Sequence, residues 1–270
     1  MRRLFALALL TASPLAIGSA PPQAGVQQIT AQERQQGAQA NAGLVAEYGG
    51  ALAGRQAAYV ERIGRRIATQ SGLSSSPAAF NVTLLNSPVN NAFAIPGGYV
   101  YVTRDLVALM NDEAELAAVM GHEVAHVAAR HSRSRQNRAT RNVLGGTILQ
   151  TIIGAVAGNS TLGSLLGRGV GVAAQLDTLG FSRGQETQSD DLAVRYLASA
   201  GYDPSALSTM LDSLARQNQL QGAFRGEARS LPAWASTHPD PASRVRRAQQ
   251  QAAQIPTAAR ARNRDAFLAA

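Results

Sequence analysis

The sequence predicts a mostly helical α+β fold in which a small antiparallel sheet packs on one central helix. Three observations support this prediction. The chain has 270 residues, 45% of them hydrophobic and only 5% aromatic, which is enough for a core of aliphatic side chains. Apolar residues recur at helical spacing in most segments between turns. Strand-like segments are confined to residues 80–103.

The N-terminus has the features of a secretory signal peptide. Two arginines precede an apolar stretch that starts at Leu4–Leu10, and small residues follow it. The stretch is too short and too interrupted to span a bilayer well. We therefore expect residues 1–20 to be a signal peptide and the protein to be exported to the periplasm; an uncleaved anchor is the alternative. Residues 21–44 are expected to form a poorly ordered lead-in that turns helical later.

The first helix and the strands follow in order. Residues 51–70 place apolar side chains at helical spacing, and the segment SGLSSSP ends this helix. Phe80–Leu85 is expected to be a strand. Residues 92–95 and 99–103 are expected to form a hairpin, because Pro96-Gly97 between them is the pair that a type II turn favours at its centre.

The clearest helix runs from Asp112 to about Ser132. Asp112 and Glu115 have the spacing of a capping box, and apolar residues form a stripe behind them. We expect three further helices, over residues 183–200, after Pro204 and from about Pro241. No repeat and no linker divides the chain.

The charge pattern excludes one class of partner. The net charge of +8 is carried by arginine alone, and no aromatic-plus-basic pattern of a nucleic-acid module occurs, so we expect no nucleic-acid binding. The arginine-rich residues 130–141 are either a solvated helix end or a peripheral contact with an anionic membrane. The glycine-rich residues 143–176 are either a buried helix with turns or a lid or lipid-facing loop. Without cysteine, the chain has no disulfide and no lipid-attachment cysteine.

An H-E-x-x-H motif stands inside the clearest helix. Residues four apart share a helix face, so His122 and His126 can bind one ion, and Glu123 can reach a water on that ion. With four histidines in the chain, the number of copies expected by chance is about 0.002, so coincidence is a poor explanation.

The spacing of residues leaves the third ligand open. A catalytic zinc needs three protein ligands and an open position. Ala129 and Ser132 stand where a metzincin would have glycine and histidine, and His131 is expected to point away from the motif. The next glutamate is Glu186, four residues before Asp190. These two carboxylates are either a ligand with an outer aspartate that fixes a histidine tautomer, or an ordinary acidic helix surface.

Four segments, in this order, resemble the gluzincin metalloproteases that include the CAAX prenyl proteases, the HtpX membrane proteases and the exported BepA-type proteases. They are NAFAIPGGYVYVTRDL, DEAELAAVMGHEVAHVAARHS, SRGQETQSDDLA and STHPDPASRV. Ser189 departs from the usual E-x-x-A-D pattern. The resemblance covers about residues 45–250. It implies a zincin-like protease domain at 45–252 with one Zn²⁺ per chain. Residues 253–270 are then expected to be a C-terminal tail, too short for the repeat domain that exported relatives often carry.

The resemblance also assigns site residues. It implies that Glu123 is the general base and that Asp190 supports a ligand histidine. The implied zinc ligands are His122, His126 and Glu186. The strand that would pair with substrate contains Asn91, Ala92, Phe93 and Ala94.

His238 and Arg244 lie in the last motif. The resemblance implies that His238 reaches the zinc and holds the protease inactive; the alternative is an ordinary loop histidine. Arg244 would then face the cleft and stabilise the oxyanion.

The expected function is a zinc-dependent endopeptidase that acts on unfolded or misassembled envelope proteins. Its substrates would be unfolded or loop segments, and its water would be activated by zinc and Glu123. The alternative is a chaperone-like or peripheral membrane-binding module whose metal site is normally closed.

Overall fold

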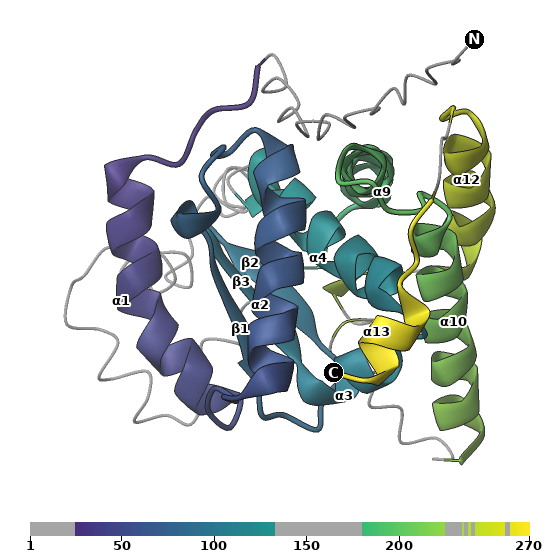
Figure 1. Ribbon diagram of the computed structural model, residues 1–270, viewed down its shortest axis with the longest axis horizontal. Helices are drawn as coiled ribbons and strands as arrows, with labels where there is room; N and C mark the ends of the chain where they lie inside the picture. Colours follow the sequence, from purple (N-terminus) through teal and green to yellow (C-terminus); the bar gives the residue numbers. More distant parts are fainter. Residues whose placement is uncertain (1–24, 133–179, 225–233, 235–236, 239–240, 257–259) are drawn as a thin grey trace, which may run out of the picture.

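The computed structural model describes residues 25–132, 180–224, 234, 237–238, 241–256 and 260–270 (Figure 1). The predicted signal peptide, most of the arginine-rich segment and residues 143–176 lie outside them. The described residues form a mostly helical α+β fold, which confirms the predicted class. None of the described helices is long and apolar enough to cross a membrane. The helices are α1 (Ala31–Glu47), α2 (Arg55–Ala68), α3 (Arg104–Ala108), α4 (Glu113–Ala128), α9 (Arg183–Ser199), α10 (Ala206–Phe224), α12 (Pro241–Ala253) and α13 (Arg264–Leu268). The strands are β1 (Asn81–Leu85), β2 (Ala92–Ile95) and β3 (Tyr99–Thr103).

The sheet has three strands in the order β1-β3-β2. β2 and β3 form the predicted hairpin and pair antiparallel, whereas β1 pairs parallel with β3. The sheet is therefore mixed, and the prediction of an antiparallel sheet is wrong for β1. An alternation of apolar residues predicts that a segment is a strand, but not which other strand it pairs with in the sheet. β1 joins the second strand of the hairpin rather than the first, and its parallel direction follows from that choice.

The hairpin turn contains two glycines that the packing requires. Gly97 and Gly98 have φ values of 100° and 90°, where other residues are strained. A side chain at Gly97 would collide with the carbonyl oxygen of Glu33, and one at Gly98 with that of Ala79. The turn can therefore lie directly against α1 and against the short helical turn before β1.

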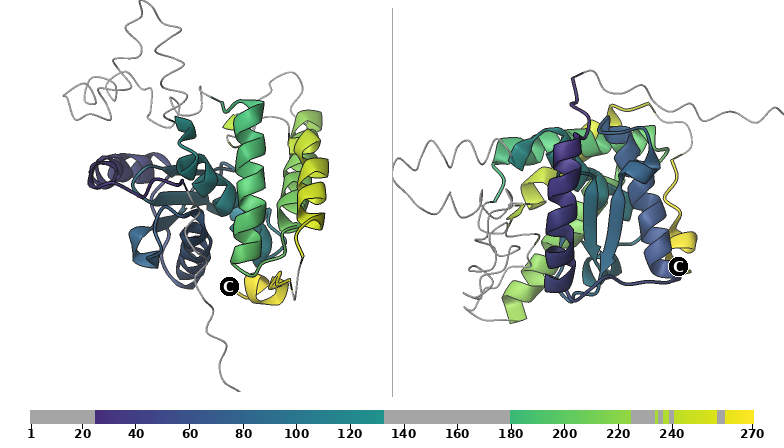
Figure 2. Two further views of the ribbon diagram at one scale, coloured as in Figure 1. Left: turned by 90° about the horizontal axis from the view of Figure 1, so that it is seen from above. Right: turned by 90° about the vertical axis from the view of Figure 1, so that its left-hand side faces the viewer.

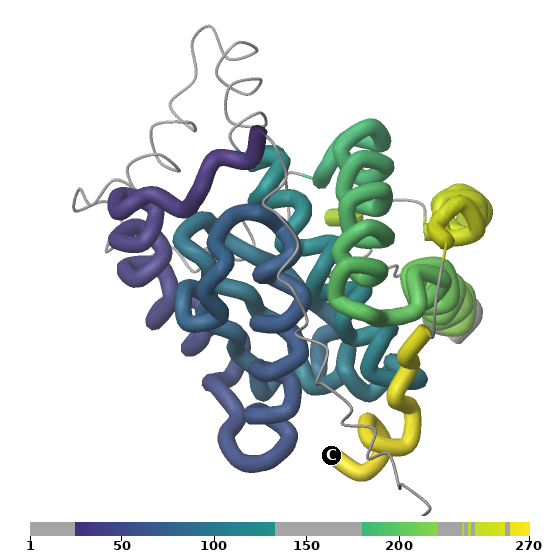
Figure 3. The backbone as a smooth tube through the Cα atoms, turned by 45° about the horizontal axis from the view of Figure 1, so that its top comes forward, coloured from purple at the N-terminus to yellow at the C-terminus, as the bar shows by residue number. Residues whose placement is uncertain are grey.

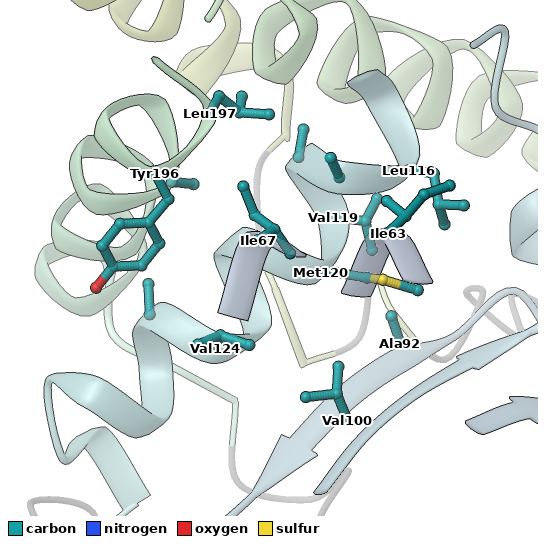
Figure 4. Packing of buried hydrophobic residues seen from close by; sticks show 14 of the residues in the cluster. Ile63, Ile67, Ala92, Val100, Leu116, Val119, Met120, Val124, Tyr196 and Leu197 are labelled. Carbon is teal, nitrogen blue, oxygen red and sulfur yellow. The ribbon is translucent and has the colours of Figure 1, made fainter. Parts of the chain in front are cut away.

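The sheet separates two layers of helices. Val100 (Figure 4) and Val102 of β3 belong to the main core with residues of α2 and α4, whereas Tyr101 packs with Leu44 of α1. One face of the sheet is thus covered by α1 and the other by α2 and α4 (Figure 2). Beyond α4 lie α9, α10 and α12, at the opposite side of the molecule from α1 (Figure 3).

Helix α4 is the centre of the fold. All of its residues are buried, because α2, the sheet, α9 and α10 pack around it. It nevertheless carries five ionisable residues, including both histidines of the motif. Buried ionisable groups are costly unless they are paired or bind an ion, so their partners show what this helix is built to hold.

The lead-in is more ordered than predicted. Residues 31–47 form helix α1, which begins with a capping box: Thr30 accepts a hydrogen bond from the Glu33 backbone, and the Glu33 carboxylate accepts one from Thr30. Leu44 is buried, and Gly37 lies against Tyr99. The sequence gives no periodic apolar signal for this helix, because few of its residues are apolar. The N-terminal cap of the helix and its contact with the sheet stabilise it instead.

The end of α4 also differs from the prediction. The helix stops at Ala128 rather than near Ser132, because Arg130 takes a left-handed conformation with φ of 57°. The Arg130 guanidinium pairs with Glu33 and donates a hydrogen bond to the Gln27 carbonyl at 2.9 Å. This contact with the segment before α1 turns the chain back after α4 and redirects His131.

The C-terminal tail is attached to the start of α4. Asp112 caps α4 by accepting a hydrogen bond from the Glu115 backbone at 2.9 Å. The Glu115 carboxylate bonds to the backbone of Asn111 rather than of Asp112, so only half of the predicted capping box forms. Arg262 of the tail donates to Asp112 at 2.7 Å and lies 3.4 Å from Glu115. The tail thus neutralises two acidic residues at the helix start.

Candidate metal centre and active site

The two motif histidines face each other on one side of α4. The Nε2 atoms of His122 and His126 are 3.0 Å apart, and both rings are buried. This is the geometry that the four-residue spacing predicts. Two imidazole nitrogens at this separation point at one common centre.

Two residues from distant parts of the chain complete the group. Glu186 lies in the first turn of α9, and its carboxylate oxygens are 3.5 Å from the Nε2 atoms of both motif histidines. His238 places its Nδ1 atom 3.2 Å from Nε2 of His122 and 3.1 Å from Glu186 Oε1. One ligand atom from each of the four residues lies within 4.8 Å of the others, and within the described residues this is the one such group.

The chemistry of this group fits a zinc ion. Three imidazole nitrogens and one carboxylate oxygen are ligands of the kind that zinc takes, and four donors suit its tetrahedral coordination. Burial would lower the pKa of His122, but hydrogen bonds with Asp190 and Glu186 outweigh it and raise that pKa to about 9. Burial and the neighbouring His122 ring lower the pKa of His126 well below its ordinary value. The carboxylates of Glu186 and Asp190 thus favour a positive charge at His122, a role that a metal cation can take.

Asp190 and Arg244 support the group from outside. Asp190 Oδ1 lies 3.0 Å from Nδ1 of His122, so it accepts that N–H and leaves Nε2 free to face the centre. Arg244 donates to both Asp190 oxygens, from Nε at 2.7 Å and from Nη2 at 2.6 Å. Its Nη1 atom is 2.6 Å from Glu186. Burial raises the pKa of Asp190, but the Arg244 charge prevails and keeps it below its usual range.

The glutamate of the motif lies beside the group. Glu123 is buried, and its Oε1 atom accepts a hydrogen bond from the indole N–H of Trp234 at 3.0 Å. The same oxygen is 3.5 Å from Nε2 of His238. The Trp234 and His238 rings stack with centroids 4.6 Å apart. A carboxylate therefore stands next to a candidate metal centre, covered by one aromatic residue and one histidine.

Comparison with known proteins shows the family of the chain. The model of peptidase family M48 matches residues 54–252, which is most of the chain. The chain belongs to peptidase family M48. The resemblance to the gluzincin proteases is thereby confirmed, and with it the prediction of a metalloendopeptidase.

Two relatives illustrate the range of this M48 family. The chain is 31% identical over 203 residues to the beta-barrel assembly-enhancing protease of Yersinia pestis; the match covers 73% of this chain and 39% of the relative. It is 31% identical over 192 residues to the mitochondrial metalloendopeptidase OMA1 of Schizosaccharomyces pombe, covering 71% of this chain and 52% of the relative. The chain thus corresponds to about two fifths to one half of the length of these M48 relatives.

Arg244 of this M48 site pairs with two buried carboxylates. We expected it to face the cleft and to stabilise an oxyanion. Pro241 starts α12, so Arg244 falls in the first turn and reaches α9, where Glu186 and Asp190 stand one turn apart. Two carboxylates of the same sign need a cation between them. The attraction of the guanidinium to both carboxylates explains why it pairs with Glu186 and Asp190.

The predicted substrate strand lies at the edge of the sheet, as β2. Asn91 is buried, and its amide donates to the Tyr48 hydroxyl at 2.7 Å. Phe93 stacks on Tyr101 on the side of α1. Ala92 and Ala94 face the core under α4. The side chains of β2 are thus used within the fold, and what β2 can offer to a ligand is its backbone edge.

Two residues of the site were missed in the sequence. Trp234 is the only tryptophan and stands four residues before His238, a spacing that would have placed both on one side of a helical turn. His131 was expected to point away from the motif, yet its Nδ1 atom lies 3.0 Å from Nδ1 of His126. The left-handed Arg130 places it there, and no sequence pattern signals that conformation at an arginine.

Proposed function

We propose that this M48 chain is a zinc endopeptidase that cleaves unfolded or misassembled envelope proteins, through a domain spanning residues 45–252. The observation that carries the proposal is the buried convergence of His122, His126 and Glu186 beside Glu123. In this assignment the first three bind one zinc ion and Glu123 is the general base.

Zinc bound there supplies a Lewis acid for the scissile carbonyl and for the attacking water. Glu123 takes the proton of that water on its carboxylate and later passes it to the leaving amine. Asp190 holds His122 in the tautomer that presents Nε2. Burial raises the pKa of Glu186, but the contacts with His238 and His122 hold that pKa far below its usual range, so this carboxylate is ionised and ready to bind metal.

The substrate is proposed to bind as an added strand along the edge of β2. Backbone pairing reads extended chains with little dependence on side chains, which suits unfolded or loop segments. The likeness to relatives named beta-barrel assembly-enhancing proteases supports an envelope substrate. An N-terminus of the signal-peptide type supports export to the periplasm. The arginine-rich segment would add a peripheral contact with the membrane.

The described geometry supports a self-inhibited resting state. His238 is a fourth donor, and four protein ligands make a closed zinc site without a place for water. Trp234 meanwhile donates its N–H to Glu123, the oxygen acceptor that the reaction needs. The backbone N–H of Trp234 is bonded to the Asn90 carbonyl at 3.1 Å, next to β2. Trp234 and His238, four residues apart in the sequence, thus cover the base and the metal centre at the same time.

Removal of the histidine tests this latch. His238→Ala is expected to raise the basal cleavage of unfolded casein at least about tenfold, with zinc retained, because one coordination position opens to water. The fluorescence of Trp234, the only tryptophan, should shift to the red as its stacking partner is lost. The matched control is Arg246→Ala, which replaces an exposed residue of α12 and should change neither the cleavage rate nor the fluorescence.

A zinc-loaded His238→Ala variant no more active than the wild type would remove the latch. It would favour the second candidate, a chaperone-like module with a permanently closed metal site, which the four-donor group also supports. Suppression of casein aggregation without cleavage would be its signature.

A further inference from the structure

The remaining histidine of the motif helix region is buried against the metal centre but does not belong to it. His131 is 3% exposed. Its Nδ1 atom faces Nδ1 of His126 at 3.0 Å, and its Nε2 atom faces the amide oxygen of Gln188 at 3.0 Å. His126 in turn directs Nε2 at the ligand group. The contacts form a chain from the Gln188 amide oxygen through the rings of His131 and His126 to the candidate metal centre.

The amide oxygen of Gln188 sets the direction of these hydrogen bonds. An amide oxygen only accepts, so Nε2 of His131 must donate to Gln188. A neutral His131 with its hydrogen on Nε2 has a bare Nδ1, which accepts. The hydrogen between the rings therefore belongs to Nδ1 of His126. Its Nε2 is then bare, with a lone pair toward His122 and Glu186.

We propose that His131 is a positioning residue that holds His126 in the tautomer and ring orientation required of a metal ligand. The inference rests on the proposed function, in which His126 binds zinc. It gives the two ligand histidines different supports: a carboxylate, Asp190, behind His122 and a neutral imidazole behind His126.

The choice of an imidazole follows from the charge of the site. Three buried carboxylates, those of Glu123, Glu186 and Asp190, already surround the centre, and Arg244 is the cation that pairs with two of them. A further carboxylate behind His126 would be buried without a partner, which costs several kcal/mol. A neutral acceptor fixes the tautomer without that cost.

Three residues hold His131 in place. Arg130, anchored to Glu33, turns the chain at the end of α4. The side-chain amide of Gln185 on α9 donates to the His131 carbonyl at 3.3 Å. The hydroxyl of Ser189 lies 3.4 Å from His131 Nδ1, at the position where the related pattern usually has alanine. This hydroxyl is therefore a second polar contact to the accepting nitrogen, and we assign it the same task.

The ring of His126 is also confined from its other side. The Phe181 ring lies with its centroid 3.6 Å from that of His126, and the Phe181 backbone N–H donates to the Thr237 carbonyl at 3.0 Å. The aromatic contact limits tilting of the imidazole, while the bond to His131 limits its rotation. Without His131, the His126 N–H would lose this acceptor.

Two replacements of His131 separate positioning from packing. His131→Leu has similar bulk but no acceptor, whereas His131→Asn has a side-chain oxygen near the place of Nδ1. Zinc affinity of the full chain is measured by competition with a chelator. His131→Leu is expected to bind zinc about 10–100-fold more weakly, as outer partners of ligand histidines generally do, and His131→Asn to recover most of the loss. Ser189→Ala should cost a few-fold at most.

Nitrogen-15 NMR of the zinc-loaded wild type, labelled at histidine, checks the tautomers directly, since the chain has only four histidines. We expect hydrogen on Nδ1 of His126 and on Nε2 of His131. Hydrogen on Nδ1 of His131 would overturn the inference. This test uses the wild type alone and so does not depend on whether the variants fold. Equal zinc affinity of His131→Leu and the wild type, or equal losses for Leu and Asn, would overturn it as well. A wild type that bound no zinc would instead overturn the proposed function, and the inference with it.

Discussion

Glu123→Gln is expected to abolish proteolysis while leaving a folded, zinc-loaded protein. Glutamine has the same shape and its amide oxygen can still accept the Trp234 N–H, but it cannot take a proton from water. Loss of a general base lowers the rate by about 10²–10⁴-fold. Zinc content should stay at that of the parent, because Glu123 is not among the grouped donors.

The rate is best measured in a His238→Ala background, where the proposed latch is open, as cleavage of unfolded casein. Glu61→Gln is the matched control, because it makes the same change at a partly exposed glutamate of α2 that pairs only with Arg65 in the described contacts. Cleavage by Glu123→Gln within a few-fold of the parent would remove this residue from the mechanism.

Glu186→Ala is expected to lose both metal and activity. The change leaves two motif histidines and His238, and it removes the only carboxylate oxygen of the group. We expect zinc affinity to fall by more than the roughly 100-fold that marks the upper end for outer partners. Isothermal titration with zinc, or chelator competition, measures the change.

Asp190→Asn is the informative comparison for Glu186→Ala. It keeps the size of the side chain that touches His122 and should cost only about 10–100-fold in affinity. Asparagine is preferable to alanine here, because alanine would leave the buried Arg244 without its main partner and so destabilise the whole fold. If Glu186→Ala kept wild-type affinity and Asp190→Asn did not, the third ligand would be Asp190.

The local part of the site could be predicted from the sequence, and the long-range part only through resemblance. His122 and His126 share a helix face by spacing alone. Glu186 could equally have been an acidic surface residue, because nothing in its own segment records that α9 packs along α4. Spacing along a chain fixes neighbours within an element, whereas the partner of an element is decided by the packing of the whole core.

The corrections have the same origin. The pairing of Arg244 was not predicted, because its position in a motif says nothing about the two carboxylates one turn apart on α9. β1 was predicted as a strand, yet its parallel pairing depends on which edge of the hairpin it meets. Helix α1 has too few apolar residues for a periodic signal and exists through contacts with the hairpin turn. In each case the interaction that decides the structure is made with a residue or strand outside the segment itself.

A crystal of the zinc-loaded full chain, with anomalous diffraction recorded at the zinc edge, tests the central claim most directly. We expect one peak per chain, about 2.0–2.2 Å from Nε2 of His122, Nε2 of His126 and a carboxylate oxygen of Glu186. His238 Nδ1 should be the fourth neighbour in the resting state. A peak elsewhere, or one at the two motif histidines without Glu186, would contradict the account.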